Sequence, residues 1–288
     1  MLILNGPDRA GRPCTSPTRN PKTLDSLLAL LSQHGSRACL LAGGTDLLVR
    51  LRARTLSPEL VIDVKGVEPL HALEHRADGT IVVGAAVVAN RIVDDKRFRP
   101  MHCGLADAAA RIATYAIRNR ATIAGNIANA SPCADSVPPL CVMGAQVEVV
   151  SVRGTRRLAL PDYIQGVRNT VRRPDELITF IHIPRLGASA RTFFRKHQRV
   201  RGHDLALANA ALLYDPESRR LRVAIGSCSP APVVLDLDDL FSSLDAEEAA
   251  RRAMAAITPI SDVRASAEYR TDMTGVLVRR LFADLKAA

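Results

Sequence analysis

Helical repeats alternate with short apolar runs along the first half of the chain. Leucines recur at helical spacing between Thr23, a candidate N-cap, and Gly35, a stop signal. The apolar run Ala38–Ala42 predicts a buried strand that leads into Gly43 and Gly44. Further strands are predicted at Leu60–Val64 and Thr80–Val83, and further helices at Leu47–Arg54, Asn90–Lys96 and Leu105–Thr114. This order of strand, glycine turn, helix and strand indicates an α/β unit.

The second half predicts strands first and helices afterwards. Strands are predicted at Ala145–Val152, Thr155–Leu160, Leu177–Ile183, Arg191–Gln198, Leu205–Tyr214 and Leu221–Ser227. Asp215–Arg219 turns the last two into an antiparallel hairpin. The tail changes character, because Asp245–Ile257 and Tyr269–Lys286 are rich in alanine, arginine and acids and predict helices. An antiparallel sheet with helices packed on one side is therefore expected, and the fold class is α+β.

The chain is long enough for one large domain or two medium ones. It has 288 residues, of which 47% are hydrophobic. The polar, basic stretch Gly166–Pro174 is the expected boundary. We therefore predict a first domain over residues 1–170, made of two α/β subdomains that divide near residues 55–60, and a C-terminal α+β domain over residues 171–288.

Two glycine-containing stretches are the strongest candidates for ligand binding. Thr122–Leu140 packs small residues, amides and hydroxyls into a run that favours neither helix nor strand. Leu40–Leu47 is a second such stretch. Either alone can be a plain surface loop. Together they can face one phosphate-bearing ligand from two sides, because backbone N–H groups in such turns form an anion-binding concavity.

Charge and composition exclude several classes of protein. The net charge is +10, but aromatic residues make up 3% of the chain and tryptophan is absent, so a base-stacking platform for nucleic acid is poorly supplied. A docking surface for an acidic partner subunit, or an arginine-rich proteome, explains the charge as well. No apolar run approaches the roughly 18 residues of a membrane span, and the N-terminus lacks a signal-peptide core. We expect a cytoplasmic protein.

Familiar catalytic patterns are missing from the sequence. The six cysteines form no Cys-x-x-Cys pair, which argues against a zinc site or an iron–sulfur cluster in this chain. The histidines form no metal-binding or triad pattern, and neither a Gly-x-Gly-x-x-Gly fingerprint nor a P-loop occurs. Any chemistry would therefore belong to a cofactor.

Three segments together resemble one known family. AGGTDL at Ala42–Leu47, TIAGNIANASPCADSVPPL at Thr122–Leu140 and KHQRVRGHDLA at Lys196–Ala206 are similar to the FAD-binding subunit of the molybdenum hydroxylases. This family includes relatives of xanthine dehydrogenase and the medium subunit of aerobic carbon monoxide dehydrogenase. The resemblance extends from about Pro17 to the C-terminus. It implies a two-domain FAD-binding fold of the vanillyl-alcohol-oxidase type, with FAD extended between the domains.

The resemblance also implies a set of cofactor-binding residues. These are Leu40, Leu41, Ala42, Gly43, Gly44, Thr45, Asp46, Leu47, Thr122, Ile123, Ala124, Gly125, Asn126, Ser131, Asp135, Ile178 and Lys196. Ala42–Asp46 and Thr122–Asn126 would hold the pyrophosphate, with Ala124 where the family usually has glycine. Ser131 and Asp135 would help to fix the flavin.

Several residues have a competing structural interpretation. Lys196 is expected near the flavin ring, where a cation stabilises the reduced form; it can also be an exposed strand lysine. Asp46 is expected to cap the following helix. Arg199 and Asp204 can form a structural ion pair.

The family's architecture implies partner subunits. A large subunit would carry the molybdopterin cofactor, and a small subunit would carry two 2Fe-2S clusters and relay electrons to this chain's FAD. The FAD would pass them to an external acceptor, in a dimer of heterotrimers. The alternatives are a stand-alone FAD-dependent reductase or oxidase and, less favoured, a basic nucleic-acid-binding protein.

Overall fold

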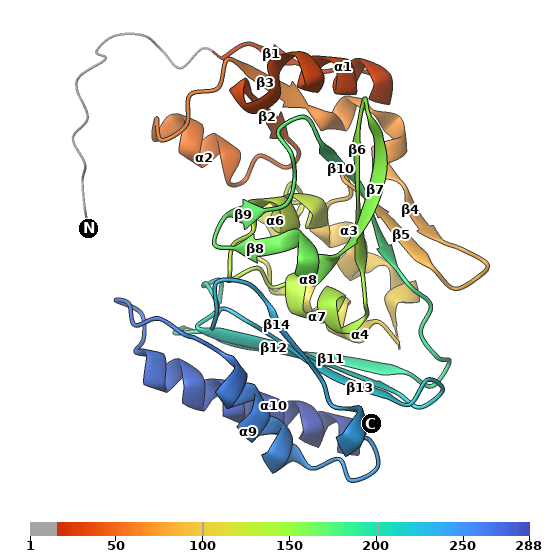
Figure 1. The fold of residues 1–288 in the computed structure, drawn as a ribbon, viewed down its shortest axis with the longest axis vertical. Helices are drawn as coiled ribbons and strands as arrows, with labels where there is room; N and C mark the ends of the chain where they lie inside the picture. Colours follow the sequence, from red (N-terminus) through yellow and green to blue (C-terminus); the bar gives the residue numbers. More distant parts are fainter. Residues whose placement is uncertain (1–15, 100, 201) are drawn as a thin grey trace.

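Three layers of secondary structure are stacked along the long axis of the molecule (Figure 1). The computed structural model describes residues 16–99, 101–200 and 202–288. The N-terminal lobe is at one end, a second sheet with short helices lies in the middle, and the C-terminal sheet and its helices close the other end (Figure 1). No described helix has both the length and the apolar character needed to cross a membrane.

The N-terminal lobe is a small parallel sheet with the strand order β1-β3-β2. Its strands and helices are β1 (Thr18–Arg19), α1 (Leu24–His34), β2 (Ala38–Leu41), α2 (Leu47–Arg52) and β3 (Leu60–Asp63). The predicted cap of α1 is confirmed, because the Thr23 hydroxyl accepts a hydrogen bond from the Ser26 N–H. Gly35 ends the helix at a φ of 51°, a left-handed value that favours glycine. The first 15 residues lie outside the described part of the chain.

The middle layer is a five-stranded antiparallel sheet with the order β4-β5-β10-β6-β7. Its strands are β4 (Leu73–His75), β5 (Ile81–Gly84), β6 (Gln146–Ser151), β7 (Gly154–Ala159) and β10 (Leu177–Ile183). The helices of this layer are α3 (Ala89–Asp94), α4 (Cys103–Ala110), α5 (Tyr115–Arg118), α6 (Ile123–Asn129), α7 (Val137–Val142) and α8 (Leu160–Tyr163). A small hairpin, β8 (Ile164–Gly166) with β9 (Asn169–Thr170), follows α8.

Strand pairing corrects two of the expected divisions. The strand Leu177–Ile183, which we predicted in the second domain, pairs with β5 and β6 at the centre of the middle sheet. The subdomain boundary expected near residues 55–60 would separate β3 from β1 and β2, but β3 pairs with both strands in one sheet. Both errors have one cause: a polar stretch marks a turn of the chain, whereas long-range pairing decides to which sheet a strand belongs.

The stretch Thr122–Leu140, predicted to be irregular, contains two short helices. Thr122 caps α6 through its hydroxyl, which accepts from the Gly125 N–H at 3.0 Å. Pro138 and Pro139 lie in the first turn of α7, where the missing proline N–H groups cost no hydrogen bond. These terminal signals, rather than an apolar repeat, start both helices.

The C-terminal layer is a sheet with the strand order β11-β12-β13-β14, and it is antiparallel, as predicted. Its parts are β11 (Arg191–His197), β12 (Ala208–Asp215), β13 (Arg220–Gly226), β14 (Val233–Asp236), α9 (Ala246–Ala256) and α10 (Ala267–Ala287). The two long helices cover one face, as expected, and α4 and α7 pack against the other (Figure 1). The strand predicted at Leu205–Tyr214 begins only at Ala208, which leaves residues 205–207 in the segment that borders the site.

Candidate cofactor cleft

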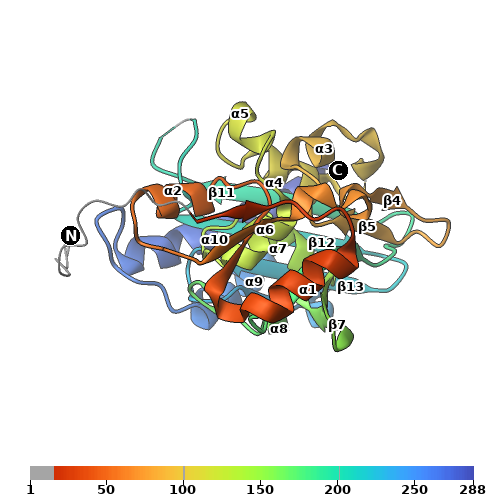
Figure 2. The ribbon, with the colours of Figure 1, turned by 90° about the horizontal axis from the view of Figure 1, so that it is seen from above.

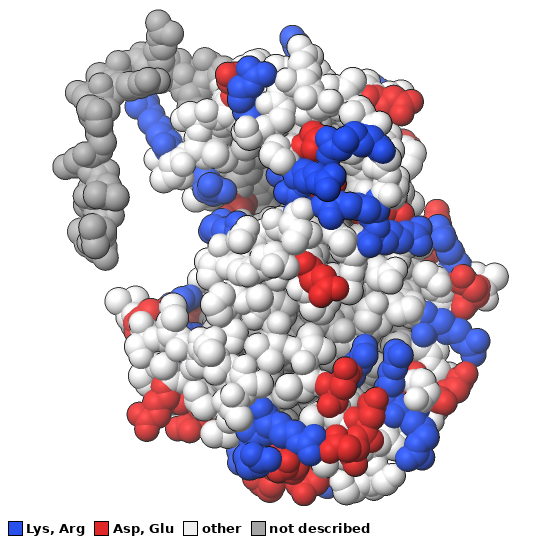
Figure 3. Space-filling model, in the orientation of Figure 1, with Lys and Arg blue, Asp and Glu red and all other residues white. Residues whose placement is uncertain are grey.

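A cleft of about 880 Å³ lies between the N-terminal lobe, α5, α6 and the segment that follows β11. The surface is hollowed between the lobe and the middle layer, with basic side chains at the edge (Figure 3). Of the 17 residues predicted to bind the cofactor, 15 line this cleft. The two that do not are Leu41 and Ile123, and the Ile123 side chain is buried in the core. Residues that are far apart in sequence, such as Thr45 and Ile178, are therefore brought together.

The first glycine loop presents backbone donors that the protein does not use. Gly44 has a φ of 75°, a left-handed value that lets the chain turn sharply after β2. Among the described residues, none accepts a hydrogen bond from the backbone N–H groups of Gly43, Gly44, Thr45, Asp46 or Leu47. Consecutive free N–H groups at a turn form a concavity that suits an anion.

Lys65 fixes the orientation of this loop. Its ammonium group donates to the carbonyl oxygen of Ala42 at 2.7 Å and to Asp63 Oδ1 at 2.6 Å. A trans peptide points its C=O and its N–H in opposite directions. Because Lys65 holds the Ala42 carbonyl, the Gly43 N–H points away from Lys65. Sequence reasoning missed Lys65, which lies 23 residues from Ala42 and in no recognised motif.

Close packing joins the first loop to the segment before the second. A Cβ atom built on Gly43 would overlap the backbone carbonyl of Arg120, far inside van der Waals contact. A Cβ built on Gly125 would meet the Thr122 hydroxyl, which caps α6, at 2.9 Å, but would approach the first loop only at the Ala42 side chain, at 4.0 Å. Gly43 is therefore required by the approach of two backbones. The second loop is more self-contained, because the Asn126 amide oxygen accepts from the Ser136 hydroxyl at 2.7 Å.

A polar clasp, formed by Asp46, Asn129 and Arg168, bridges the lobe and the middle layer. Asn129 donates to Asp46 Oδ2 at 2.8 Å, and Arg168 donates to Asn129 Oδ1 at 2.7 Å and lies 3.5 Å from Asp46. The expectation that Asp46 caps α2 is wrong, because its carboxylate makes no cap hydrogen bond. Asn129 and Arg168 line the cleft but were not among the 17 predicted residues, since their role in the clasp depends on contacts between distant segments.

The other end of the cleft holds a buried ion pair. Lys196 Nζ lies 2.7 Å from Asp135 Oδ2, and the two side chains are 2% and 6% exposed. Lys196 also donates to the Arg111 carbonyl at 3.3 Å, and the Asn209 amide donates to Asp135 Oδ1 at 3.1 Å. Burial raises the pKa of the Asp135 carboxyl, and Lys196 and Asn209 partly oppose the rise. The alternative of an exposed strand lysine is wrong, and the charge of Lys196 is matched within the protein.

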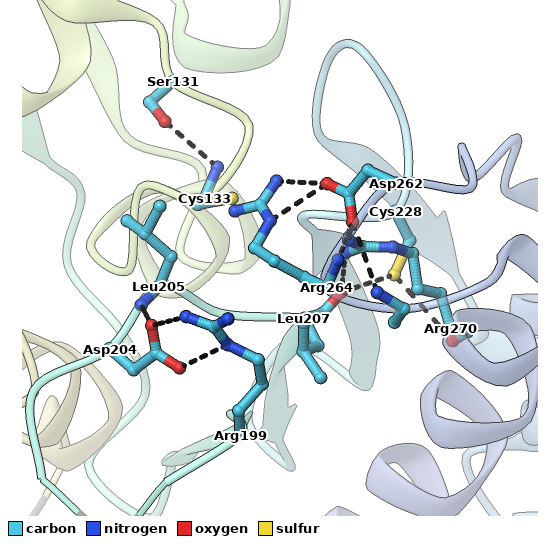
Figure 4. A network of polar contacts seen from close by, with 11 residues as sticks. Ser131, Cys133, Arg199, Asp204, Leu205, Leu207, Cys228, Asp262, Arg264 and Arg270 are labelled. Carbon is cyan, nitrogen blue, oxygen red and sulfur yellow. Dashed lines mark hydrogen bonds and ion pairs between the residues drawn. The ribbon is translucent and has the colours of Figure 1, made fainter. Parts of the chain in front are cut away.

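A network of arginines and acids anchors the wall beside this pair (Figure 4). Arg199 and Asp204 form the ion pair that we considered, at 3.0 Å. Arg270, which is fully buried, donates to the Leu207 carbonyl at 2.7 Å and to Asp262 at 2.9 Å. Arg264 reaches from the same Asp262 toward Cys133, a residue of the cleft wall (Figure 4). The C-terminal layer thus holds the segment after β11 and the loop around Cys133 in place.

The donors around the cleft fit an extended, anionic dinucleotide. Free N–H groups line one end, and the nearby acids Asp46 and Asp135 are both engaged in internal contacts. Arg50 and Arg172 line the same cleft, and neither has a carboxylate partner among the described residues. No cluster of histidine, cysteine or acidic side chains suited to a metal occurs in the described part of the chain. Arg50 and Arg172 could not be identified as site residues from the sequence, because arginines occur along the whole chain.

Comparison with known proteins gives one family for the whole chain. The model of the FAD-binding domain in molybdopterin dehydrogenase matches residues 16–186, and that of the CO dehydrogenase flavoprotein C-terminal domain matches residues 192–285. The interval between them separates β10 from β11. The chain is 30% identical to the carbon monoxide dehydrogenase medium chain of Afipia carboxidovorans, over 93% of this chain and 95% of the relative.

Other relatives agree in both sequence and structure. The chain is 30% identical to subunit alpha of the 6-hydroxypseudooxynicotine dehydrogenase complex of Paenarthrobacter nicotinovorans, with 91% of each covered. The solved structure of reconstituted CO dehydrogenase from Oligotropha carboxidovorans matches with a TM-score of 0.84 at 28% identity, covering 91% of this chain and 94% of that chain. The chain therefore belongs to the family of FAD-binding medium subunits of the molybdenum hydroxylases.

Proposed function

We propose that the 15 predicted residues that line this cleft, together with Arg50 and Arg172, bind one FAD there, and that Lys65 orients the first glycine loop. The chain is the FAD-carrying electron-transfer subunit of a multi-subunit molybdenum hydroxylase, in keeping with its family. When bound, FAD collects electrons from iron–sulfur clusters of a partner subunit and passes them to an external acceptor. The observation that carries the residue assignment is the row of unused N–H groups from Gly43 to Leu47 along the cleft wall.

The residues of this chain bind and orient rather than react. Neutral backbone donors offset phosphate charge at the loop Ala42–Asp46, and Arg50 and Arg172 add positive charge nearby. Ser131, Ile178 and the pair of Asp135 with Lys196 form the opposite end, where we place the flavin. A matched ion pair there offers a fixed dipole rather than a free cation. Lys196 is thus expected to influence the flavin less than an unpaired lysine would.

We extend the proposal to the assembly. Two copies each of this chain, a molybdopterin subunit and a 2Fe-2S subunit would form a dimer of heterotrimers. Relatives that are named as chains of larger complexes support the multi-subunit part of this proposal. We also propose a cytoplasmic location, supported by the buried thiols of Cys141 and Cys228, which are not joined in disulfides.

Reconstitution of the purified full-length chain with FAD, and in parallel with FMN, tests the proposal. We expect one FAD per chain, a flavin absorption spectrum, and weaker binding of FMN, which lacks the second phosphate and the adenosine. Acid precipitation should release the yellow cofactor, because no covalent attachment is expected. Failure to bind flavin after repeated reconstitution would contradict the proposal. Molybdenum and iron that co-purify with a tagged chain would distinguish the multi-subunit enzyme from a stand-alone flavoenzyme.

A further inference from the structure

The ion pair at the end of the cleft where we place the flavin rests on a row of residues from three neighbouring strands. Lys196 of β11 pairs with Asn209 of β12, and Asn209 pairs with Gly226 of β13. Cross-strand partners carry their side chains on the same face of a sheet. In the view from above, α7 lies over this part of the C-terminal sheet, and Asp135 precedes α7 in the chain (Figure 2). The row therefore supports Asp135 from the side of the sheet.

Each carboxylate oxygen of Asp135 has its own donor from this row. Lys196 Nζ lies 2.7 Å from Oδ2, and the Asn209 amide donates to Oδ1 at 3.1 Å. Asp135 and Lys196 line the cleft, whereas Asn209 does not and is fully buried. Any influence of Asn209 on a bound cofactor must therefore pass through Asp135.

Asn209 is a polar residue in an apolar row. On β12, Ala211 and Leu213 share its face and belong to the hydrophobic core of the middle layer. Asn209 Oδ1 is buried and has no hydrogen-bond partner among the described residues. An unpaired buried acceptor destabilises a fold. Stability alone therefore does not account for an amide at this position.

Gly226 leaves the space that this amide occupies. A Cβ atom built on Gly226 would lie 2.3 Å from Asn209 Oδ1 and 3.1 Å from the Pro138 side chain. Even an alanine at position 226 would have to displace the amide or the backbone. The glycine on β13 thus keeps the amide in the place from which it reaches Asp135.

The charge of Asp135 depends on these neighbours. Burial raises the pKa of the Asp135 carboxyl, and the donors Lys196 and Asn209 oppose this rise. Arg111, which follows α4, is a further charged side chain that acts on Asp135. From α7 the titratable group is the Cys141 thiol, whose pKa burial raises, so it stays neutral. Loss of the Asn209 donor would favour the protonated form of Asp135.

We infer that Asn209 is a positioning residue for the flavin, because it holds Asp135 as a carboxylate against Lys196 while FAD is reduced. The inference rests on the proposed function, since it concerns FAD bound in this cleft. Reduction of FAD takes up two electrons from the iron–sulfur partner and protons from the solvent. With Asn209 in place, these protons go to the flavin and not to Asp135. Without Asn209, Asp135 takes up a proton, and Lys196 becomes an unmatched cation that stabilises the reduced flavin.

Asn209→Leu, which keeps the size of the side chain and removes the donor, tests the inference in the full-length FAD-loaded chain. We expect the two-electron reduction potential of FAD to rise by about 30 mV, a tenfold change in the equilibrium constant. The potential should also fall more steeply with rising pH than in the wild type, because reduction takes up an additional proton at Asp135. Redox titration over a series of pH values measures both effects.

Asn90→Leu is the matched control. Asn90 is buried, and its amide is hydrogen-bonded to Asn119, but it does not line the cleft. Its loss should lower stability and leave the flavin potential unchanged. The double variant Asn209→Leu/Asp135→Asn should lose the steeper pH dependence, because an amide at position 135 has no proton to gain.

Gly226→Ala provides an independent route to the same result. The added methyl group displaces the Asn209 amide without removing it, so the potential should rise as in Asn209→Leu. This variant decides the question if Asn209→Leu does not fold.

Potentials equal to the wild type in Asn209→Leu and Gly226→Ala would overturn the inference, and so would an equal rise in Asn90→Leu. Loss of FAD from both folded variants would make Asn209 a residue for binding rather than for positioning, which also contradicts it. The flavin absorbance of each sample separates the two proposals. A wild-type chain that binds no FAD refutes the cofactor site, whereas loaded variants with unchanged potentials refute only the role of Asn209.

Discussion

The two ends of the cofactor cleft are built on different physical principles. At one end, the loop Ala42–Asp46 presents neutral N–H groups that have no partner among the described residues. At the other end, Lys196 and Asp135 are full charges that neutralise each other in a buried pair. The first end is ready for an anion without the cost of a buried charge. The second end is already satisfied, so it contributes shape and a fixed dipole more than net charge.

This difference separates binding from stability. Free backbone donors add little to folding, because nothing in the chain accepts from them, and their value appears only when a ligand arrives. A buried ion pair is the reverse case: loss of one partner leaves an uncompensated charge that destabilises the fold itself. Substitutions at the loop end should therefore change the affinity for FAD, and substitutions at the ion-pair end should change the free energy of unfolding. If both kinds of substitution change the same quantity, the comparison is wrong.

The largest effect is expected for Lys196→Met. Asp135 would lose the only cationic partner that it has among the described residues. Removal of one member of a buried pair lowers the free energy of unfolding by about 3–5 kcal/mol. Urea denaturation of the FAD-free chain measures this loss. The double variant Lys196→Met/Asp135→Asn, which removes both charges, should recover much of it. A single variant as stable as the wild type would show that the pair is not stabilising.

The same variant should acquire a distinct pH dependence. Burial already raises the pKa of Asp135, and loss of Lys196 raises it further. In the interval between the unfolded pKa near 4 and the raised folded pKa, the native state binds more protons than the unfolded state. Unfolding free energy should therefore fall as pH rises through that interval. The Asp135→Asn companion should abolish this slope, and a slope that persists in it would exclude Asp135 as the source.

At the loop end, Gly43→Ala should abolish most FAD binding. Even a methyl group would overlap the Arg120 carbonyl, so the two backbones must separate and the N–H groups move out of position. We expect FAD affinity to fall at least 100-fold, about 2.7 kcal/mol, measured by fluorescence titration. Gly166→Ala is the control, because its built Cβ meets only Pro230, at 3.9 Å. Normal FAD binding by Gly43→Ala would show that the apposition of the loops is dispensable.

Lys65→Met should have a smaller effect of the same kind. The variant keeps the length of the side chain but frees the Ala42 carbonyl, so the Gly43 peptide can rotate. FAD affinity should fall about tenfold, or 1.4 kcal/mol, with the change mainly in the dissociation rate. Lys65→Arg should retain part of the affinity, because a guanidinium can still donate to the carbonyl. Equal affinity for the Met variant and the wild type would remove Lys65 from the site.

The sequence predicted local features better than pairings. Helix α1 could be found because its leucine repeat, Thr23 and Gly35 lie within a dozen residues. The residues of the cleft were expected from the resemblance of the two glycine loops to the family. The partnership of Asp135 and Lys196 spans 61 residues, and that of Ala42 and Lys65 spans 23. Neither follows from residue type alone, since the fold decides which charges meet. The central position of β10 was missed for the same reason.

The smallest effect is expected for Ala124→Gly, which tests whether the second loop depends on close backbone approach. Ala124 lies in the first turn of α6 and lines the cleft, at the position where the resemblance to the family led us to expect glycine. The loops already meet through Gly43 and Arg120, so removal of this methyl group should leave FAD affinity within about threefold of the wild type, or 0.7 kcal/mol. Unfolding free energy should decrease by about 0.5–1 kcal/mol, because glycine loses more conformational freedom in a helix than alanine does.

Fluorescence titration and urea denaturation of the same preparation measure the two quantities, with Ala128→Gly in the same helix as the control for helix propensity. If FAD affinity falls tenfold in Ala124→Gly but not in Ala128→Gly, the Ala124 methyl group contacts the cofactor, and the second loop contributes side-chain packing where the first contributes only backbone donors.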